Sequence, residues 1–148
     1  MELLKQFIVA GIATFGFAKY FNVKLKAPLI AASLAGGLSW MIYNIIYYSH
    51  GSKVLGALFG TLTLGILGEF LSRKFKFPAT LFITPGIVPL VPGAGMYYTA
   101  LHFVNGDFQQ LLQVGSETIF IAGAIALGIL ASSLFSKPLS RIRKHNIK

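Results

Sequence analysis

The residues best suited to chemistry lie in one uncharged stretch, residues 77–104, where prolines and glycines alternate with hydroxyl side chains. A proline inside a helix removes an N–H donor and clashes one turn back, so Pro85, Pro89 and Pro92 predict unpaired carbonyl groups, that of Val88 among them. At membrane depth such groups need a partner helix, water or a ligand, and broken helices of this kind often build transporter substrate sites. The alternative is a kinked helix that packs tightly through its glycines.

The glycines that follow predict where this segment breaks. We expect the break at residues 93–95 and a half-helix over residues 96–104, whose first N–H groups would attract a carboxylate. Threonine hydroxyls nearby could contact a substrate or bond to their own helix backbone. The predicted substrate-binding residues are Thr84, Pro85, Gly86, Pro89, Pro92, Gly93, Gly95, Tyr97 and Tyr98.

Acidic side chains are rare in this chain, and acids inside a membrane are functional candidates. Glu69 lies four residues before Arg73, a spacing that predicts an interfacial ion pair and leaves proton coupling as the alternative. We expect Asp107 to lie in a turn, and Glu117 to lie in the first turn of the last helix, capped by Ser116.

Several classes of function are excluded by what the sequence lacks. It has no cysteine, no zinc-protease motif, no phosphate-binding glycine loop and no catalytic triad, so we expect no enzyme, no metal site and no cofactor. The formal charge of +9 comes from short basic clusters between apolar runs and not from a basic domain. Nucleic acid is therefore not an expected partner.

The composition instead makes the lipid bilayer the expected solvent. Hydrophobic residues make up 55% of the 148 residues and charged residues only 11%, and the mean hydropathy is +0.70. Backbone groups in lipid must pair internally, and the runs lack the alternation of barrel strands, so we predict an all-α membrane protein. The prediction is one transmembrane domain, residues 1–148, with five helices and the fourth broken by proline and glycine. The spans are 3–21, 28–48, 54–71, 77–104 and 118–135, the last ended by Lys137 and Pro138.

The first of these segments resembles a signal peptide in having Lys5 before an apolar run. It lacks a clear small-x-small cleavage site, so we expect it to remain as a span.

Glycines recur in the spans, and we expect them to mark close helix contacts. Gly56 and Gly60 fit the small-xxx-small pattern, and Gly123 lies on the last span.

The positions of lysine and arginine predict the orientation, because short cytoplasmic loops retain positive charge. All 13 of these residues except Lys5 and Lys53 fall between spans one and two, between three and four, or after the fifth. We therefore expect a multi-pass protein of the bacterial inner membrane with its N-terminus outside and its C-terminus in the cytoplasm.

Two stretches carry a resemblance to a known family. Residues 16–23 read GFAKYFNV, and residues 77–101 contain the pattern Pro-Gly-x-x-Pro-x-x-Pro-Gly. In these stretches and in the order of its segments, the chain resembles the small subunit of the two-component threonine/serine exporters and the C-terminal half of single-chain members. The resemblance implies a five-helix subunit that pairs with a larger membrane subunit and exports threonine and serine, or a dicarboxylate such as succinate.

The predicted function is thus part of a secondary exporter for small carboxylate metabolites, driven by the proton gradient. A homo-oligomer is a second arrangement that the sequence leaves open. The alternative function is a passive channel or a structural subunit that stabilises a separate transporter.

Overall fold

The computed structural model describes the backbone of residues 2–145 and the side chains of residues 2–134, and every regular element in these ranges is a helix. The elements are α1 (Glu2–Tyr20), α2 (Lys26–His50), α3 (Lys53–Phe75), α4 (Thr80–Ile87), the 3-10 turn η1 (Val88–Leu90), α5 (Gly93–Val104) and α6 (Phe108–His145). The predicted all-α class is therefore confirmed for the described part of the chain. The basic residues from Lys137 onward, on which the predicted orientation partly rests, lie outside the described side chains.

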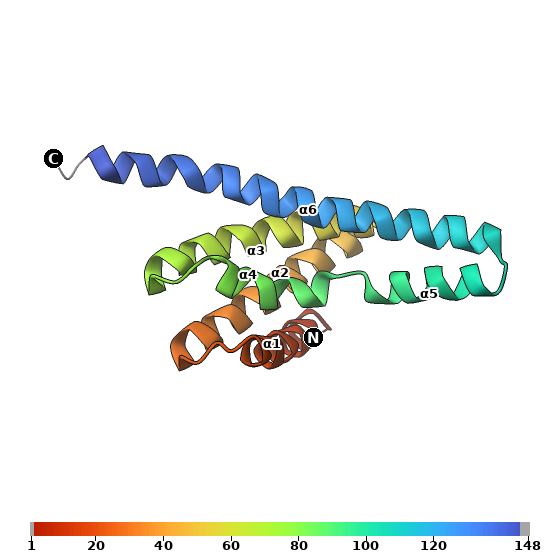
Figure 1. The fold of residues 1–148 in the computed structure, drawn as a ribbon, viewed down its shortest axis with the longest axis horizontal. Helices are drawn as coiled ribbons and strands as arrows, with labels where there is room; N and C mark the ends of the chain where they lie inside the picture. Colours follow the sequence, from red (N-terminus) through yellow and green to blue (C-terminus); the bar gives the residue numbers. More distant parts are fainter. Residues whose placement is uncertain (1, 146–148) are drawn as a thin grey trace.

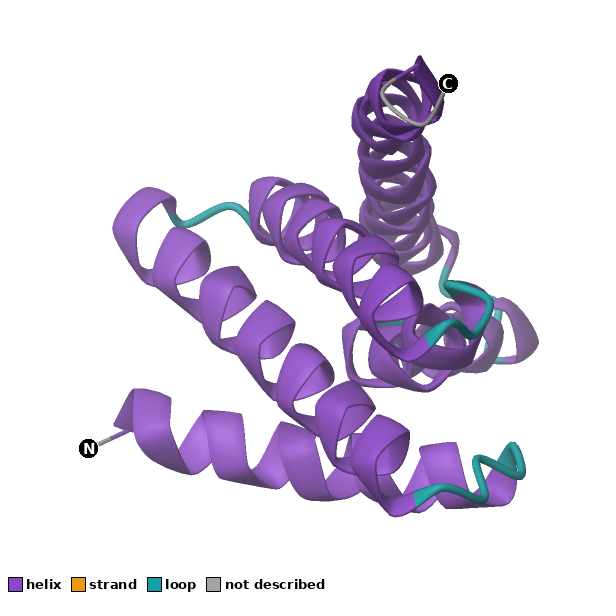
Figure 2. Cartoon of the chain, turned by 90° about the vertical axis from the view of Figure 1, so that its left-hand side faces the viewer, coloured by secondary structure: helices purple, strands orange, loops and turns teal. Residues whose placement is uncertain are grey.

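The helices form a bundle from which one hairpin projects. Figure 1 shows α1 to α4 gathered on one side, while α5 and the first half of α6 extend away from them. Figure 2, turned by 90°, shows α6 end-on and α1 running across the molecule. Helix α5 consequently packs against α6 and has no buried residue.

Three of the described helices are long and apolar enough to cross a membrane: α2, α3 and residues 108–134 of α6. The pair formed by residues 80–90 and 93–104 would make a fourth if it is one bent span. Helix α1 is not among them, and it carries Glu2 as well as Lys5 and Lys19. The chain is thus a multi-pass membrane protein, while the five predicted spans are not confirmed.

Small residues let the helices approach closely, as the glycine pattern predicted. A Cβ atom added to Gly56 would lie 2.9 Å from the carbonyl oxygen of Tyr43, and one added to Gly60 would lie 3.0 Å from that of Ser39. Both glycines therefore belong to the contact between α3 and α2. Gly123 differs, because nothing lies within 4 Å of an added Cβ there, so the prediction of a close helix contact at this position is wrong within the chain.

The last helix begins earlier and ends later than predicted. Helix α6 starts at Phe108, where Asp107 Oδ1 accepts a 3.2 Å hydrogen bond from Gln110 N as an N-cap. Ser116 is therefore not a cap, and its hydroxyl donates to the Gln113 carbonyl oxygen at 3.1 Å. The helix also continues past Lys137 and Pro138 to His145, because a single proline costs a helix one hydrogen bond without forbidding the next turn.

Two small groups of buried side chains hold the bundle together. One joins α2, α3, η1 and α6 and includes Ala57, Leu64 and Leu90. The other joins α1, α2 and α4 around Phe82, which is fully buried. The second group fixes α4 in the bundle, so the break that follows α4 separates a packed helix from an exposed one.

Candidate functional site

The proline-rich segment is broken, as the sequence predicted, and the break falls at Val91 and Pro92. Helix α4 and η1 lie on one side and α5 on the other, bent by 51°. The predicted position was the glycines at 93–95, which instead form the first turn of α5. Glycine can be accommodated in a helix that has already begun. Pro92 has no N–H to donate to the turn before it, so the proline determines where the helical hydrogen bonds end.

Backbone hydrogen bonds near the break use some of the groups that were expected to be unpaired. Val91 N donates to the carbonyl oxygens of Ile87 at 3.2 Å and Val88 at 3.3 Å, so the prediction of an unpaired Val88 carbonyl is wrong. Gly93 N donates to Val91 O at 2.8 Å. Pro92 is the N-cap of α5 and makes no side-chain capping bond, so the positive end of the α5 dipole has no side-chain acceptor at its cap.

Three of the predicted substrate-binding residues serve packing. Pro85 and Gly86 are buried in α4, and a Cβ atom added to Gly86 would meet the Leu64 side chain. Gly95 faces α6, where an added Cβ would meet the Thr118 hydroxyl. These glycines are needed for close helix contact, which is the alternative that the sequence left open.

Other members of the predicted set face outward. Tyr97 and Tyr98 are 64% and 50% exposed, and their rings contact each other edge-on with centroids 5.4 Å apart. Thr84 is exposed, and Gly93 is exposed with nothing within 4 Å of an added Cβ. Pro89 and Pro92 are half-buried on either side of the break. The predicted set therefore does not surround one enclosed cavity within this chain.

A cavity that the sequence did not reveal lies between α5 and α6. It has a volume of about 540 Å³ and is lined by apolar side chains such as Met96, Phe103 and Ile119, with Thr99 and Thr118 among them. Both hydroxyls are occupied, because Thr99 donates to Gly95 O at 2.6 Å and Thr118 donates to Val114 O at 2.7 Å. Its walls suit an apolar occupant rather than a carboxylate. The sequence signal for it is the small residues that line it on both helices, Ala100, Gly115 and Ala122.

Buried hydroxyls elsewhere in the bundle bond in the same way. Thr14 donates to Ala10 O at 2.8 Å, Ser39 to Ala35 O at 2.6 Å, and Thr61 to Ala57 O at 2.6 Å. Of the threonines near the break for which this bonding was the alternative, Thr99 follows it, since its hydroxyl donates to Gly95 O.

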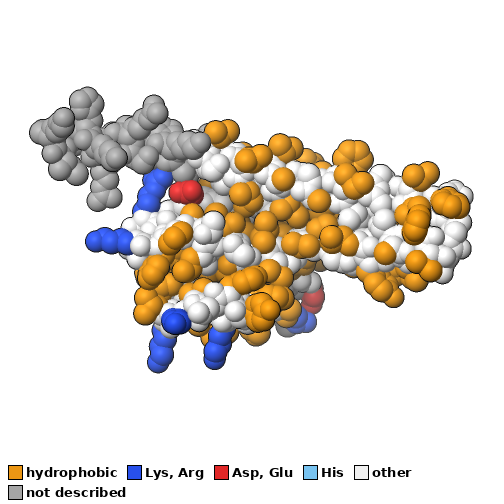
Figure 3. Space-filling model, viewed as in Figure 1, with side chains coloured by type: hydrophobic (Ala, Val, Ile, Leu, Met, Phe, Trp, Pro, Cys, Tyr) orange, Lys and Arg blue, Asp and Glu red, His pale blue; other side chains and the backbone are white. Residues whose placement is uncertain are grey.

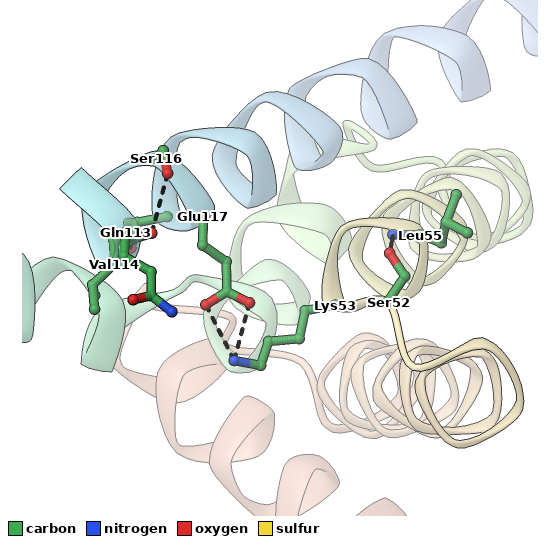
Figure 4. Close-up of polar contacts among 8 residues, drawn as sticks. Ser52, Lys53, Leu55, Gln113, Val114, Ser116 and Glu117 are labelled. Carbon is green, nitrogen blue, oxygen red and sulfur yellow. Dashed lines mark hydrogen bonds and ion pairs between the residues drawn. The ribbon is translucent and has the colours of Figure 1, made fainter. Parts of the chain in front are cut away.

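Each carboxylate side chain of the protein has a partner. Glu69 lies 4.0 Å from Arg73, which confirms the predicted ion pair. Glu117 lies 3.1 Å from Lys53 and so ties α6 to the start of α3, as Figure 4 shows. Because α6 starts at Phe108, Glu117 lies beyond the first turn of its helix, contrary to prediction. The remaining two pairs are Glu2 with Lys5 at 3.0 Å and Asp107 with His102 at 3.7 Å.

The described side chains offer no group of three or more His, Asp or Glu residues that could hold a metal ion.

Comparison with known proteins gives consistent matches. Residues 6–135 match the family model described as Threonine/Serine exporter, ThrE. An uncharacterized protein of Haemophilus influenzae is 30% identical over 142 residues, which cover 90% of this chain and 48% of that protein. A probable threonine/serine exporter of Mycobacterium tuberculosis is 27% identical over 136 residues, which cover 85% of this chain and 25% of that protein. The chain thus spans half or less of the length of these relatives, and no solved structure matches it significantly.

Proposed function

Because this chain belongs to the threonine/serine exporter family, we propose that it is a membrane subunit of a secondary exporter for small carboxylate metabolites. The observation that carries this proposal is the family match over most of the chain, residues 6–135. The family is one of exporters and not of enzymes, in agreement with the sequence analysis. Threonine and serine are the first substrates to test, and a dicarboxylate such as succinate is the second.

The exporter needs a second membrane component in this proposal. The chain covers only part of its relatives, and α5 projects from the bundle without one buried residue. Its exposed apolar side chains include Met96, Phe103 and Val104. A larger subunit of the same family would cover this surface, and a second copy of the chain is the other arrangement to test.

The substrate carboxylate is proposed to bind at the break, against the N-terminus of α5. Gly93 leaves the main chain open to a ligand, and Pro92 brings no side-chain acceptor to the cap. Tyr97 and Tyr98 face away from this chain, so their hydroxyls would contribute to a site completed by the partner. Pro85, Gly86 and Gly95 support the site through packing.

Proton coupling and orientation are further parts of the proposal. Glu69 is the acid for coupling that the sequence singled out, although its ion pair with Arg73 favours a structural role. We propose a bacterial inner-membrane location, with the N-terminus outside and the C-terminus in the cytoplasm.

The test is transport by purified protein in sealed vesicles. The chain together with a larger family subunit should drive threonine or serine uphill when a proton gradient is applied, and neither component alone should do so. Transport that only relaxes a substrate gradient would support the passive channel instead. Full activity of the larger component alone would support a structural role for this chain, and full activity of this chain alone would refute the two-component arrangement.

A further inference from the structure

A basic hollow lies where the end of α1 meets the start of α2. Its volume is about 630 Å³, and its polar lining consists of Lys19, Lys24 and Lys26 together with Asn22. Asn22 adopts a left-handed backbone conformation with φ 64°, which turns the chain tightly and keeps the lysines on one short segment. Three like charges on eight consecutive residues repel one another unless an anion is present.

The side chains that the structure describes supply no such anion. The chain's four acidic side chains each have a partner: Glu2 pairs with Lys5, Glu69 with Arg73, Asp107 with His102, and Glu117 with Lys53. None of the three lysines in the hollow makes an ion pair with a described side chain. The backbone adds to the positive potential, because α2 starts at Lys26 behind Leu25, which provides no side-chain cap.

An apolar groove continues from this hollow along α1 and α2. The groove has a volume of about 310 Å³, and Phe15 and Ile30 line both it and the hollow. Farther along, its walls include Gly11 and Leu34, and its polar member Ser33 donates its hydroxyl to Leu29 O at 2.9 Å. Such a groove suits a hydrocarbon chain.

We propose that this composite site binds one anionic phospholipid. The phosphate lies among Lys19, Lys24 and Lys26, and one acyl chain follows the groove past Phe15. A small metabolite would satisfy the charges and leave the groove empty, whereas a phospholipid has both an anionic head for the hollow and an apolar tail for the adjoining groove. Figure 3 shows lysine and arginine side chains gathered at the left-hand end of the molecule, as expected of a surface that meets lipid headgroups. Basic pockets between membrane helices are known to bind such headgroups.

The test measures lipid binding to the full-length chain in mild detergent by native mass spectrometry. Phosphatidylglycerol should bind more tightly than phosphatidylcholine with the same acyl chains. Each lysine near a charged lipid surface strengthens binding about fivefold. The double substitution Lys24→Gln with Lys26→Gln should therefore raise the apparent Kd for phosphatidylglycerol about 25-fold. Lys24→Arg with Lys26→Arg should restore binding to within about threefold, because the charge is kept.

A matched control removes the same charge elsewhere. Lys74→Gln with Lys76→Gln changes two basic residues at the end of α3 and should alter the Kd by less than about twofold, since neither lines the hollow. Equal effects of the two glutamine pairs would overturn the proposal, because binding would then follow net charge. Equal affinity for the two phospholipids would overturn it as well. Displacement of the lipid by free glycerol phosphate at a similar concentration would show that the site recognises phosphate alone, and would refute the role of the groove.

Discussion

The contact between α1 and α2 provides a quantitative test of the fold, through the substitution Gly37→Ala. An added Cβ at Gly37 would lie 2.9 Å from the carbonyl oxygen of Phe7 and 2.9 Å from its ring, closer than ordinary van der Waals contacts of 3.4–4 Å. The carbonyl belongs to the backbone, so the whole helix must retreat by about half an ångström to relieve the clash. Overpacking of this kind costs about 1–3 kcal/mol.

Gly11→Ala is the matched control for this substitution. Gly11 lies on the same contact, but its added Cβ would be 3.6 Å from the carbonyl oxygen of Ser33, which is an ordinary distance. Both variants share the helix-propensity gain of about 1 kcal/mol for replacing glycine by alanine. The predicted difference in free energy of unfolding between them is therefore the overpacking cost, about 1–3 kcal/mol.

The single tryptophan supplies the assay. Trp40 lies one turn from Gly37, and its indole N–H donates to Gln6 on α1 at 2.8 Å. A retreat of α1 would lengthen this bond and change the fluorescence of Trp40. The same fluorescence would report unfolding in mixed micelles as the fraction of dodecyl sulfate is raised. Equal stability of Gly37→Ala and Gly11→Ala, with unchanged tryptophan emission, would refute the close approach of the two helices.

Three further predictions concern transport and topology. Gly93→Leu should abolish export and leave the yield of folded protein unchanged, because nothing in the chain lies close to a side chain added at Gly93. Gly95→Leu should instead lower the yield, because its side chain would crowd α6. Export that survives Gly93→Leu would place the carboxylate elsewhere. An impermeant thiol reagent applied to intact cells should label Ser52→Cys and not Ser140→Cys, and equal labelling would refute the orientation. Glu69→Gln should leave the pH dependence of export unchanged and cost less than about 1 kcal/mol, since its ion pair is partly exposed; a lost pH dependence would assign Glu69 to proton coupling.

The strongest sequence predictions concerned long uncharged runs. Residues 28–48 and 54–71 lie within α2 and α3, respectively. A single apolar run of this length in lipid forms a helix because a helix pairs its backbone N–H and C=O groups within the segment. The start of α6 was missed, because the sequence prediction placed the cap at Ser116 and the first turn at Glu117. Glutamine and leucine in residues 109–113 favour helix, and Asp107 caps it. Hydropathy identifies the apolar run of a helix, and it does not identify the residue at which the helix begins.

The candidate site was predicted less completely for a different reason. Proline identified the break, because its effect on the backbone is local. The role of Gly95 depends on Thr118, which is distant in sequence and becomes its neighbour only when α5 folds back on α6. The basic hollow was not predicted either. In the sequence, Lys19 and Lys26 indicated only the orientation in the membrane, and their position beside the groove depends on the turn at Asn22.

The hydroxyls that donate to their own helices have a consequence for selectivity. Thr14, Ser39, Thr61, Thr99 and Thr118 have each used their one hydrogen atom, and only lone pairs remain on their oxygens. Thr14, Ser39 and Thr61 are fully buried, so only the half-buried Thr99 and Thr118, which line the cavity between α5 and α6, can accept a hydrogen bond from a ligand. Neither has a hydrogen atom left to donate. An ammonium group can therefore be recognised by these two hydroxyls, while an anionic group must find its donors elsewhere, in main-chain amides, basic side chains or the hydroxyls of Tyr97 and Tyr98.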